Sequence, residues 1–130
     1  MDDNEYKKLL KRFIVPTLRR ASYRWPERNE SLKAAKLERG VYKCANCELP
    51  HPRKNVQIDH IEPVVPLEVT LTTQSWDSYI ERMFCTRDKY QILCEQCHDL
   101  KSSMEVQTRK ANRAKLKKKC KKSVVKKKRK

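Results

Sequence analysis

Two pairs of cysteines constrain the fold of this chain more than any other feature of its sequence. Cys44 and Cys47 form one pair and Cys94 and Cys97 the other, each with a two-residue gap, and 46 residues separate the pairs. A two-residue gap in a tight turn lets both thiolates point at one tetrahedral ion, and two such pairs complete a four-sulfur shell. We therefore predict a structural zinc ion that joins two distant segments. Redox-active or unrelated thiols are the alternative.

A structural zinc ion would also stabilise a chain of this size and composition. The chain has 130 residues, 38% of them apolar, which allows one domain with a thin core. A metal that joins distant segments supplies folding free energy directly. Of the remaining cysteines, we expect Cys85 in the core and Cys120 as an exposed thiol. The first residues lack the pattern of a secretory signal, so we expect the cytoplasm and no disulfides.

The charge is concentrated at the C-terminus. The chain has 32 Lys and Arg against 16 Asp and Glu, a formal net charge of +16. Residues 106–130 hold 14 basic and no acidic residues, so residues 1–105, with 18 basic and 16 acidic groups, carry only +2. This distribution favours a polyanionic partner, of which nucleic acid is the commonest. A solubilising end is the alternative. No window is apolar enough for a membrane span.

Two groups of basic residues are candidates for binding nucleic-acid phosphates. One lies between residues 19 and 25, where arginines are interleaved with aromatic residues; a water-facing helix end is the alternative. The other lies in the basic tail. The candidates are Arg19, Arg20, Arg24, Lys117, Lys118, Lys119, Lys121 and Lys122.

Apolar spacing predicts helices in residues 1–40. One helix covers about residues 6–18, starts at Asp2 and Asp3, and is expected to be kinked or interrupted by Pro16. A second runs from Pro26 to about residue 39, where Gly40 fits the position that ends a helix.

The hydrophobic period changes after residue 40. Strands are predicted at residues 41–47 and 56–61, with a loop at 49–52 in which His51 is expected to be solvated rather than a ligand. Ser75 can cap a short helix whose apolar face holds Trp76, Ile80, Met83 and Phe84. An apolar run leads into Cys94, and a last helix begins near Glu95. We predict an α+β fold with a helical region (1–40), a zinc-stapled core (41–105) and a basic tail (106–130) that starts helical and is disordered beyond about Lys115.

Polar residues near the cysteines form a candidate catalytic group. Asp59 and His60 end a predicted strand, His98 directly follows Cys97, and Lys101 comes three residues later. A zinc ion that gathers all four thiolates draws these segments together. Adjacent strand residues point to opposite sides, so one of the first two could bind a metal while the other faces a substrate.

These motifs resemble those of the HNH endonucleases, the ββα-metal nuclease fold. The resemblance covers residues 44–101, 58 of 130 positions. The block at residues 75–85 also resembles the insert of small free-standing HNH endonucleases of bacteriophages. Besides the first cysteine pair, the matching segments are Gln57-Ile58-Asp59-His60-Ile61-x-Pro63 and Ile92-Leu93-Cys94-x-x-Cys97-His98-x-x-Lys101.

The resemblance implies a phosphodiesterase that uses one divalent ion. His60 matches the general base that deprotonates water, and Asp59 matches an acid that binds the ion, usually Mg²⁺. His98 matches the second ligand, and its imidazole would also admit Mn²⁺, Co²⁺ or Ni²⁺. Lys101 matches a basic position near the phosphate; an ordinary surface lysine is the alternative. Lys89 replaces the usual asparagine that orients the histidine, and lysine cannot accept a hydrogen bond.

Three functional hypotheses follow. The first is a metal-dependent endonuclease acting on double-stranded DNA, in a bacterial host's cytoplasm if a phage encodes it. The second is a non-catalytic zinc module that binds DNA or RNA through the basic tail. The third is a zinc-stapled interaction module whose tail serves solubility. An Asp-His pair outside the zinc shell favours the first, because a structural zinc module does not need one.

Overall fold

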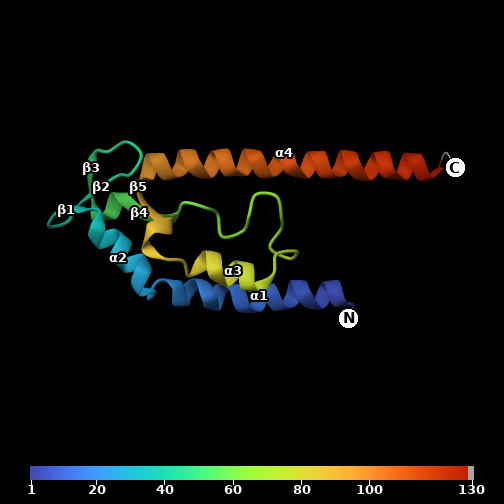
Figure 1. Cartoon of the computed structure of the whole chain (residues 1–130), viewed down its shortest axis with the longest axis horizontal. Coiled ribbons are helices and arrows are strands. Elements are labelled where there is room, and N and C mark those ends of the chain that lie inside the picture. The colour runs from blue at the N-terminus through green and yellow to red at the C-terminus, as the bar shows by residue number, and fades with distance from the viewer. Residues whose placement is uncertain (129–130) are drawn as a thin grey trace.

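The structure is a computed structural model that describes residues 1–128, so the last two residues of the basic tail, Arg129 and Lys130, lie outside it. The fold is a mixture of helices and small sheets, which confirms the predicted α+β class. The strands gather at one end of the molecule, and the two longest helices run along its two sides (Figure 1). In chain order the elements are α1 (Asp3–Ser22), α2 (Pro26–Ala34), β1 (Lys36–Glu38), β2 (Val41–Lys43), β3 (Pro50–Pro52), β4 (Val56–His60), α3 (Trp76–Met83), β5 (Tyr90–Cys94) and α4 (Glu95–Lys128), with one-turn 3₁₀ helices at Arg53–Asn55 and Arg87–Lys89.

Two small antiparallel sheets position the cysteines. One has the strand order β1-β2-β3, and the first cysteine pair lies in the connection between β2 and β3. The other pairs β4 with β5, from Val56 opposite Cys94 to His60 opposite Tyr90. Helix α4 follows β5 without a linker. The predicted strand at residues 56–61 is therefore confirmed as β4. Its partner β5 ends at Cys94, and Cys97 follows in the first turn of α4.

Helix α1 begins as predicted and continues through its proline. Asp2 and Glu5 form a reciprocal capping box, each side chain accepting from the other's backbone N–H. Pro16 lies inside the helix without ending it, so the predicted interruption is wrong. The proline ring removes the hydrogen bond to the carbonyl of Arg12. Because Pro16 and Arg12 are both exposed, water can take the place of the missing donor.

The second helix is shorter than the sequence predicts. Helix α2 ends at Ala34, and residues 36–38 form β1 instead of continuing the helix. Pairing with β2 decides the structure here, against a local sequence that suits a helix. Gly40 has φ of 74°, the left-handed conformation that glycine adopts at little cost. It therefore turns the chain between β1 and β2 and does not end a helix.

Helix α3 packs on α1 through a face that differs from the predicted one by one residue. Ser75 caps the helix by accepting from the backbone N–H of Ser78. The buried cluster between the helices contains Val15, Tyr79 and Met83, whereas Ile80 is 44% exposed. The expectation for Ile80 is wrong because Tyr79 takes the inward position.

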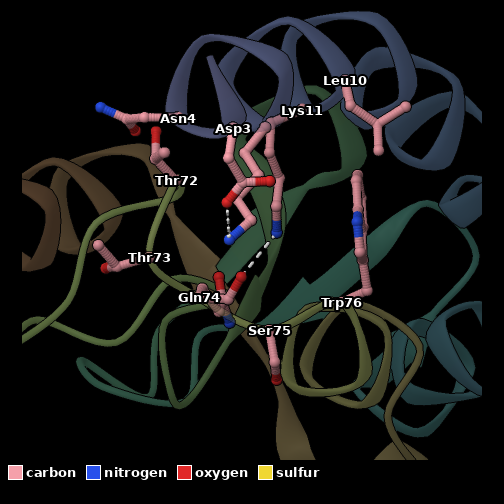
Figure 2. Close-up of a pocket in the computed structure, with 10 residues that line it drawn as sticks. Asp3, Asn4, Leu10, Lys11, Thr72, Thr73, Gln74, Ser75 and Trp76 are labelled. Atoms are coloured by element: carbon pink, nitrogen blue, oxygen red, sulfur yellow. Dashed lines mark hydrogen bonds and ion pairs between the residues drawn. The ribbon is translucent and has the colours of Figure 1, made fainter.

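A buried lysine joins α1 to the segment before α3. Lys11 is 5% exposed, and its ammonium donates to the carbonyl of Gln74 at 2.8 Å and lies 4.0 Å from the centre of the Trp76 ring. Figure 2 shows this ammonium pointing from α1 toward Gln74 in a pocket between the two segments. Burial lowers the pKa of Lys11. The carbonyl dipole and the ring face compensate for part of the lost hydration.

Helix α4 holds the long connection between β4 and α3 in place. Arg109 donates to the carbonyls of Val65 at 2.6 Å and Pro66 at 3.2 Å, and Asn112 donates to that of Leu67 at 3.0 Å. The first third of the basic tail is therefore part of the fold. Among the described residues, none of the helices has the length and apolar character needed to cross a membrane.

The rest of the basic tail is helical where disorder was predicted. Helix α4 continues to Lys128 as one element that extends past the other helices (Figure 1). The expectation of disorder beyond about Lys115 therefore differs from the structure. Residues 106–128 contain no glycine or proline, and Lys, Arg, Ala and Leu have high helix propensity.

The contacts of Arg109 give a test of this arrangement. We expect Arg109→Ala to lower the free energy of unfolding by about 1–3 kcal/mol, because two carbonyls lose a charged donor. Chemical denaturation of the full chain measures the change. Arg113→Ala, one turn further along α4 and exposed, is the control and should change stability by less than about 0.5 kcal/mol. Equal effects would show that α4 does not hold the connection.

Candidate functional site

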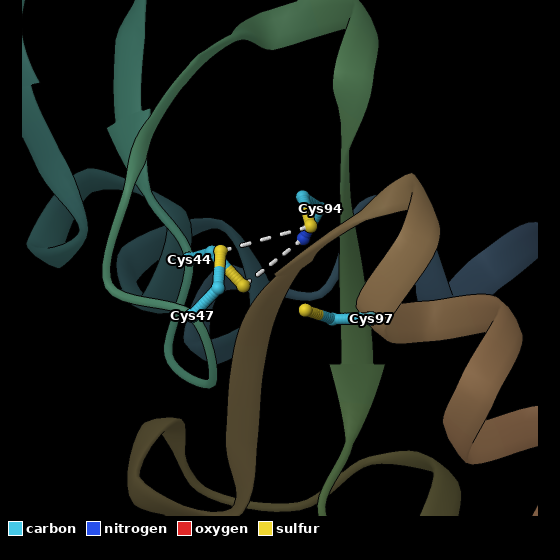
Figure 3. A group of neighbouring side chains, drawn as sticks. All are labelled: Cys44, Cys47, Cys94 and Cys97. Atoms are coloured by element: carbon cyan, nitrogen blue, oxygen red, sulfur yellow. Dashed lines mark hydrogen bonds between the residues drawn. The ribbon is translucent and has the colours of Figure 1, made fainter.

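The four paired cysteines form one cluster. Each offers a sulfur, and all four sulfurs lie within 4.8 Å of one another. The turn after β2 supplies Cys44 and Cys47, and the junction of β5 with α4 supplies Cys94 and Cys97 (Figure 3). The Sγ atoms of Cys47 and Cys94 are 3.9 Å apart, close to the about 3.8 Å between sulfurs bound tetrahedrally to zinc at about 2.3 Å. The cluster could hold a metal ion, and zinc fits its size and its sulfur chemistry.

Hydrogen bonds to sulfur prepare the cluster for negative charge. The backbone N–H of Cys94 donates to Sγ of Cys44 at 3.3 Å. Burial acts to raise the pKa of Cys44, but the backbone donors of Cys94, Cys47 and Asn46 lower that pKa to about 6. The backbone of Cys97 acts to lower the pKa of Cys94, but burial and the neighbouring thiols raise it to about 11. Ionisation of one thiol thus opposes ionisation of the next, because neighbouring thiolates repel each other. A bound cation removes this repulsion.

His51 lies closer to the cluster than its sequence context predicts. Its Nε2 is 3.6 Å from Sγ of Cys47, and the residue is half-buried, not solvated. The short strand β3 brings it there, because His51 pairs with Tyr42 of β2. Its position four residues after Cys47 in the sequence was the available signal. As a neighbour of the sulfur shell, His51 can donate to the thiolate of Cys47.

Asp59 is the centre of a second polar group. Its Oδ1 lies 3.7 Å from Nε2 of His98, and its Oδ2 accepts from Lys101 at 2.9 Å and from Gln91 at 3.0 Å. The side chains of Asp59 and His98 are 15% and 27% exposed. Strand β4 supplies the carboxylate, and the first two turns of α4 supply the imidazole and the ammonium. The same junction that carries the cysteines therefore orients this group.

Lys101 is held in its charged form. Its Nζ contacts the carboxylates of Asp59 and Glu105 and donates to the carbonyl of His60 at 2.9 Å. Burial acts to lower the pKa of Lys101, but Glu105 and Asp59 raise it above its usual value. The ammonium therefore offers a fixed positive charge next to Asp59, and it also neutralises part of the carboxylate that the resemblance assigns to a metal.

Asp59 and His98 are the two side chains of this group that could hold a divalent ion, provided that the ion keeps most of its water. Neighbouring ligands of an octahedral ion with bonds of about 2.1 Å lie about 3 Å apart, and the two atoms here are 3.7 Å apart. Among the described residues, the four cysteines form the one group of three or more potential metal-binding side chains that lie this close together. Asp59 and His98 would thus be joined by waters rather than by a third His, Cys, Asp or Glu.

His60 lies apart from this pair. Its Nε2 is 3.1 Å from the carbonyl oxygen of Met83, and its ring centre is 4.8 Å from that of Tyr90. Strand pairing persists to the last residue of β4, so His60 and Asp59 point to opposite faces. Burial lowers the pKa of His60, which keeps the imidazole neutral at pH 7. The structure thus brings together Asp59, His98 and Lys101, but not His60.

The backbone of Lys89 supports the end of β4. Its carbonyl accepts from the backbone N–H of Ile61 at 3.0 Å. A lysine side chain cannot accept a hydrogen bond, but this main-chain contact fixes the residue that follows His60. The departure from asparagine at this position therefore does not leave the loop without support.

The residues predicted to bind nucleic acid are all exposed. Arg19, Arg20 and Arg24 lie at the end of α1 and in the turn after it. The five tail lysines lie on α4, 16 or more residues beyond Lys101, which contacts Asp59. No pattern in the sequence pointed to Arg28, which is half-buried in α2 with its guanidinium 4.9 Å from the centre of the Tyr23 ring.

Comparison with known proteins yields no assignment. No protein-family model, curated protein or solved structure matches the chain. Function is therefore inferred from the chemistry of the cysteine cluster, the Asp59 group and the basic surfaces.

The cysteine cluster predicts that metal is required for folding. We expect about one zinc ion per chain, and we expect Cys97→Ser to lose both the zinc and cooperative unfolding, because structural zinc contributes about 10–16 kcal/mol in small domains. Elemental analysis and thermal unfolding measure these effects. Cys120→Ser, which changes an exposed thiol on α4, is the control and should keep metal and stability. A Cys97→Ser protein that unfolds like wild type would contradict the structural role.

Proposed function

We propose that this chain is a zinc-stapled DNA endonuclease of the HNH type that hydrolyses phosphodiester bonds with the help of one divalent ion. The observation that carries the proposal is the approach of the Asp59 carboxylate to the His98 imidazole, 3.7 Å apart, at the junction fixed by the cysteine cluster. A carboxylate, an imidazole and a nearby ammonium are more than a structural zinc module needs.

The chemistry of this group suits phosphodiester hydrolysis. Asp59 and His98 would hold the divalent ion, Mg²⁺ or a softer ion such as Mn²⁺, which when bound supplies positive charge to the reacting phosphate. Lys101 adds a fixed charge on the same side of β4. The exposed lysines of α4 supply affinity for the DNA backbone, which carries no sequence information by itself.

His60 is the proposed general base, and its geometry sets a condition on that role. A neutral imidazole can accept a proton from water, and burial lowers the pKa of His60. The ring has to leave the carbonyl of Met83 and turn toward the Asp59 side of the strand end. The role thus requires a rearrangement at the end of β4 when substrate binds.

A non-catalytic zinc module that binds DNA or RNA is the second candidate function. Two contacts favour it: Lys101 occupies one oxygen of Asp59 at 2.9 Å, and Met83 occupies Nε2 of His60 at 3.1 Å. In this function both contacts are structural. The basic helix α4 then carries the activity, and no divalent ion is needed beyond zinc.

Plasmid cleavage with matched variants separates the two functions. With Mg²⁺ or Mn²⁺, we expect the wild-type chain to relax supercoiled plasmid, and we expect His60→Ala and Asp59→Ala to lower the rate by about 10²–10⁴ while keeping zinc. Gln57→Ala, an exposed change on the same strand, is the control and should cut normally.

Each outcome of that experiment assigns a function. A wild-type protein with normal zinc that does not cut would favour the binding module. Unchanged cleavage by His60→Ala would reject His60 as the base, and unchanged cleavage by Asp59→Ala would reject the proposed ion site.

The salt dependence of DNA binding tests the role of α4. A variant with glutamine at Lys117, Lys118, Lys119, Lys121 and Lys122 keeps Arg109 and Asn112, which hold the fold. We expect its slope of log affinity against log salt to fall by up to about 4.5, because each lost phosphate contact removes about 0.9. Fluorescence anisotropy with a short duplex measures the slope. Arginine at the same positions should preserve it, and an unchanged slope in the glutamine variant would show that these lysines do not contact DNA.

A further inference from the structure

A pocket lies on the face of β4 that points away from Asp59. Its volume is about 260 Å³, and side chains of α1, α2, β4 and α3 line it. One part of the wall is apolar, with Ile58 and Met83 among its residues. The other part is polar and is formed by Arg19, Arg28 and His60. Helices α1 and α2, which the motifs at residues 44–101 do not include, supply both arginines of the pocket.

The two arginines of the pocket have no acidic partner. Two other guanidinium groups have acidic partners: Arg87 with Glu27 at 3.0 Å and Arg82 with Glu62 at 3.8 Å. Among the described residues, neither Arg19 nor Arg28 forms a salt bridge. Arg28 is half-buried and stacks on Tyr23, so its guanidinium is partly removed from water without a compensating anion. Such an arrangement favours binding of an anion from solution.

Tyr79 supplies an independent sign of a missing partner. The residue is 1% exposed and lines the same pocket. Its hydroxyl is buried, and the Arg19 guanidinium lies near it without completing a hydrogen bond of standard geometry. A buried hydroxyl without a partner is uncommon in folded proteins and is destabilising. A ligand oxygen held between Tyr79 and the arginines would satisfy this group.

The shape and charge of the pocket select the ligand. The planar fork of arginine matches the oxygens of a phosphate, and the apolar wall suits a sugar or a base. We propose that this pocket binds one nucleotide unit through its phosphate, with Arg19 and Arg28 on the phosphate oxygens and the Tyr79 hydroxyl as a neutral donor. The choice of a nucleotide over other organic phosphates rests on the proposed function. The binding of phosphate does not, because strand β4 separates the pocket from Asp59 and His98.

The phosphate could come from a free nucleotide or from the backbone of a nucleic acid. The test uses the full-length zinc-loaded chain without added divalent ion, so that binding is measured separately from cleavage. Deoxyadenosine 5′-monophosphate and a short single-stranded DNA without terminal phosphates are titrated in parallel by calorimetry. Deoxyadenosine without phosphate is the ligand control and should not bind.

Matched variants identify the pocket. We expect Arg28→Gln to lower the affinity for the ligand by about tenfold or more, because a charged hydrogen bond is lost. Tyr79→Phe removes the hydroxyl alone and should weaken it by several-fold without lowering thermal stability. Arg39→Gln removes an exposed arginine in the turn between β1 and β2, outside the pocket, and is the control for net charge.

The pattern of affinities decides the proposal and its source of phosphate. If the Arg28→Gln and Tyr79→Phe variants lose affinity only for the mononucleotide, the ligand is a free nucleotide. If they lose affinity for the single-stranded DNA, the ligand is the backbone of a nucleic acid. Equal effects of Arg28→Gln and Arg39→Gln on both ligands, or no effect of Tyr79→Phe, would overturn the proposal. Normal nucleotide binding by a chain that does not cut DNA would reject the endonuclease and leave this pocket in place.

Discussion

The approach of four thiols from two distant segments is the interaction on which the rest of the structure depends. One of the two buried clusters consists of Cys44, Cys94 and Cys97 with Leu93, so the sulfurs are themselves much of the core. They join the turn after β2 to the start of α4, and α4 in turn carries His98 and Lys101 to Asp59. A chain with so few other buried side chains has little to hold this junction if the sulfurs separate.

Strand β4 divides the chemistry of the molecule into two sides. Asp59 faces α4, together with an imidazole and an ammonium, whereas His60 faces the helices of the N-terminal region. The division follows from strand pairing that continues through the last residue of β4. Groups that are adjacent in the sequence therefore serve different surfaces, and the chain gains two polar sites from one five-residue strand.

Local patterns in the sequence predicted the elements whose structure local physics decides. The cysteine spacing, the alternation in β4 and the cap at Ser75 each require no knowledge of distant residues. The failures at β1, at Gly40 and in the candidate site depend on long-range contacts. Residues 36–38 become a strand because β2 lies beside them, and Gly40 turns between strands for the same reason. The contact of His60 with Met83 and the lining of the pocket by Arg28 join segments that no spacing rule connects.

The continuity of α4 sets a fixed distance between the Asp59 group and the lysines proposed to bind DNA. His98 and Lys117 lie on one uninterrupted helix, 19 residues apart, and a rise of about 1.5 Å per residue separates them by about 28 Å. That length corresponds to about eight base pairs of a duplex that rises about 3.4 Å per step. In the proposed function, a duplex lying along this helix would meet the lysines and the Asp59 group at positions about three-quarters of a helical turn apart.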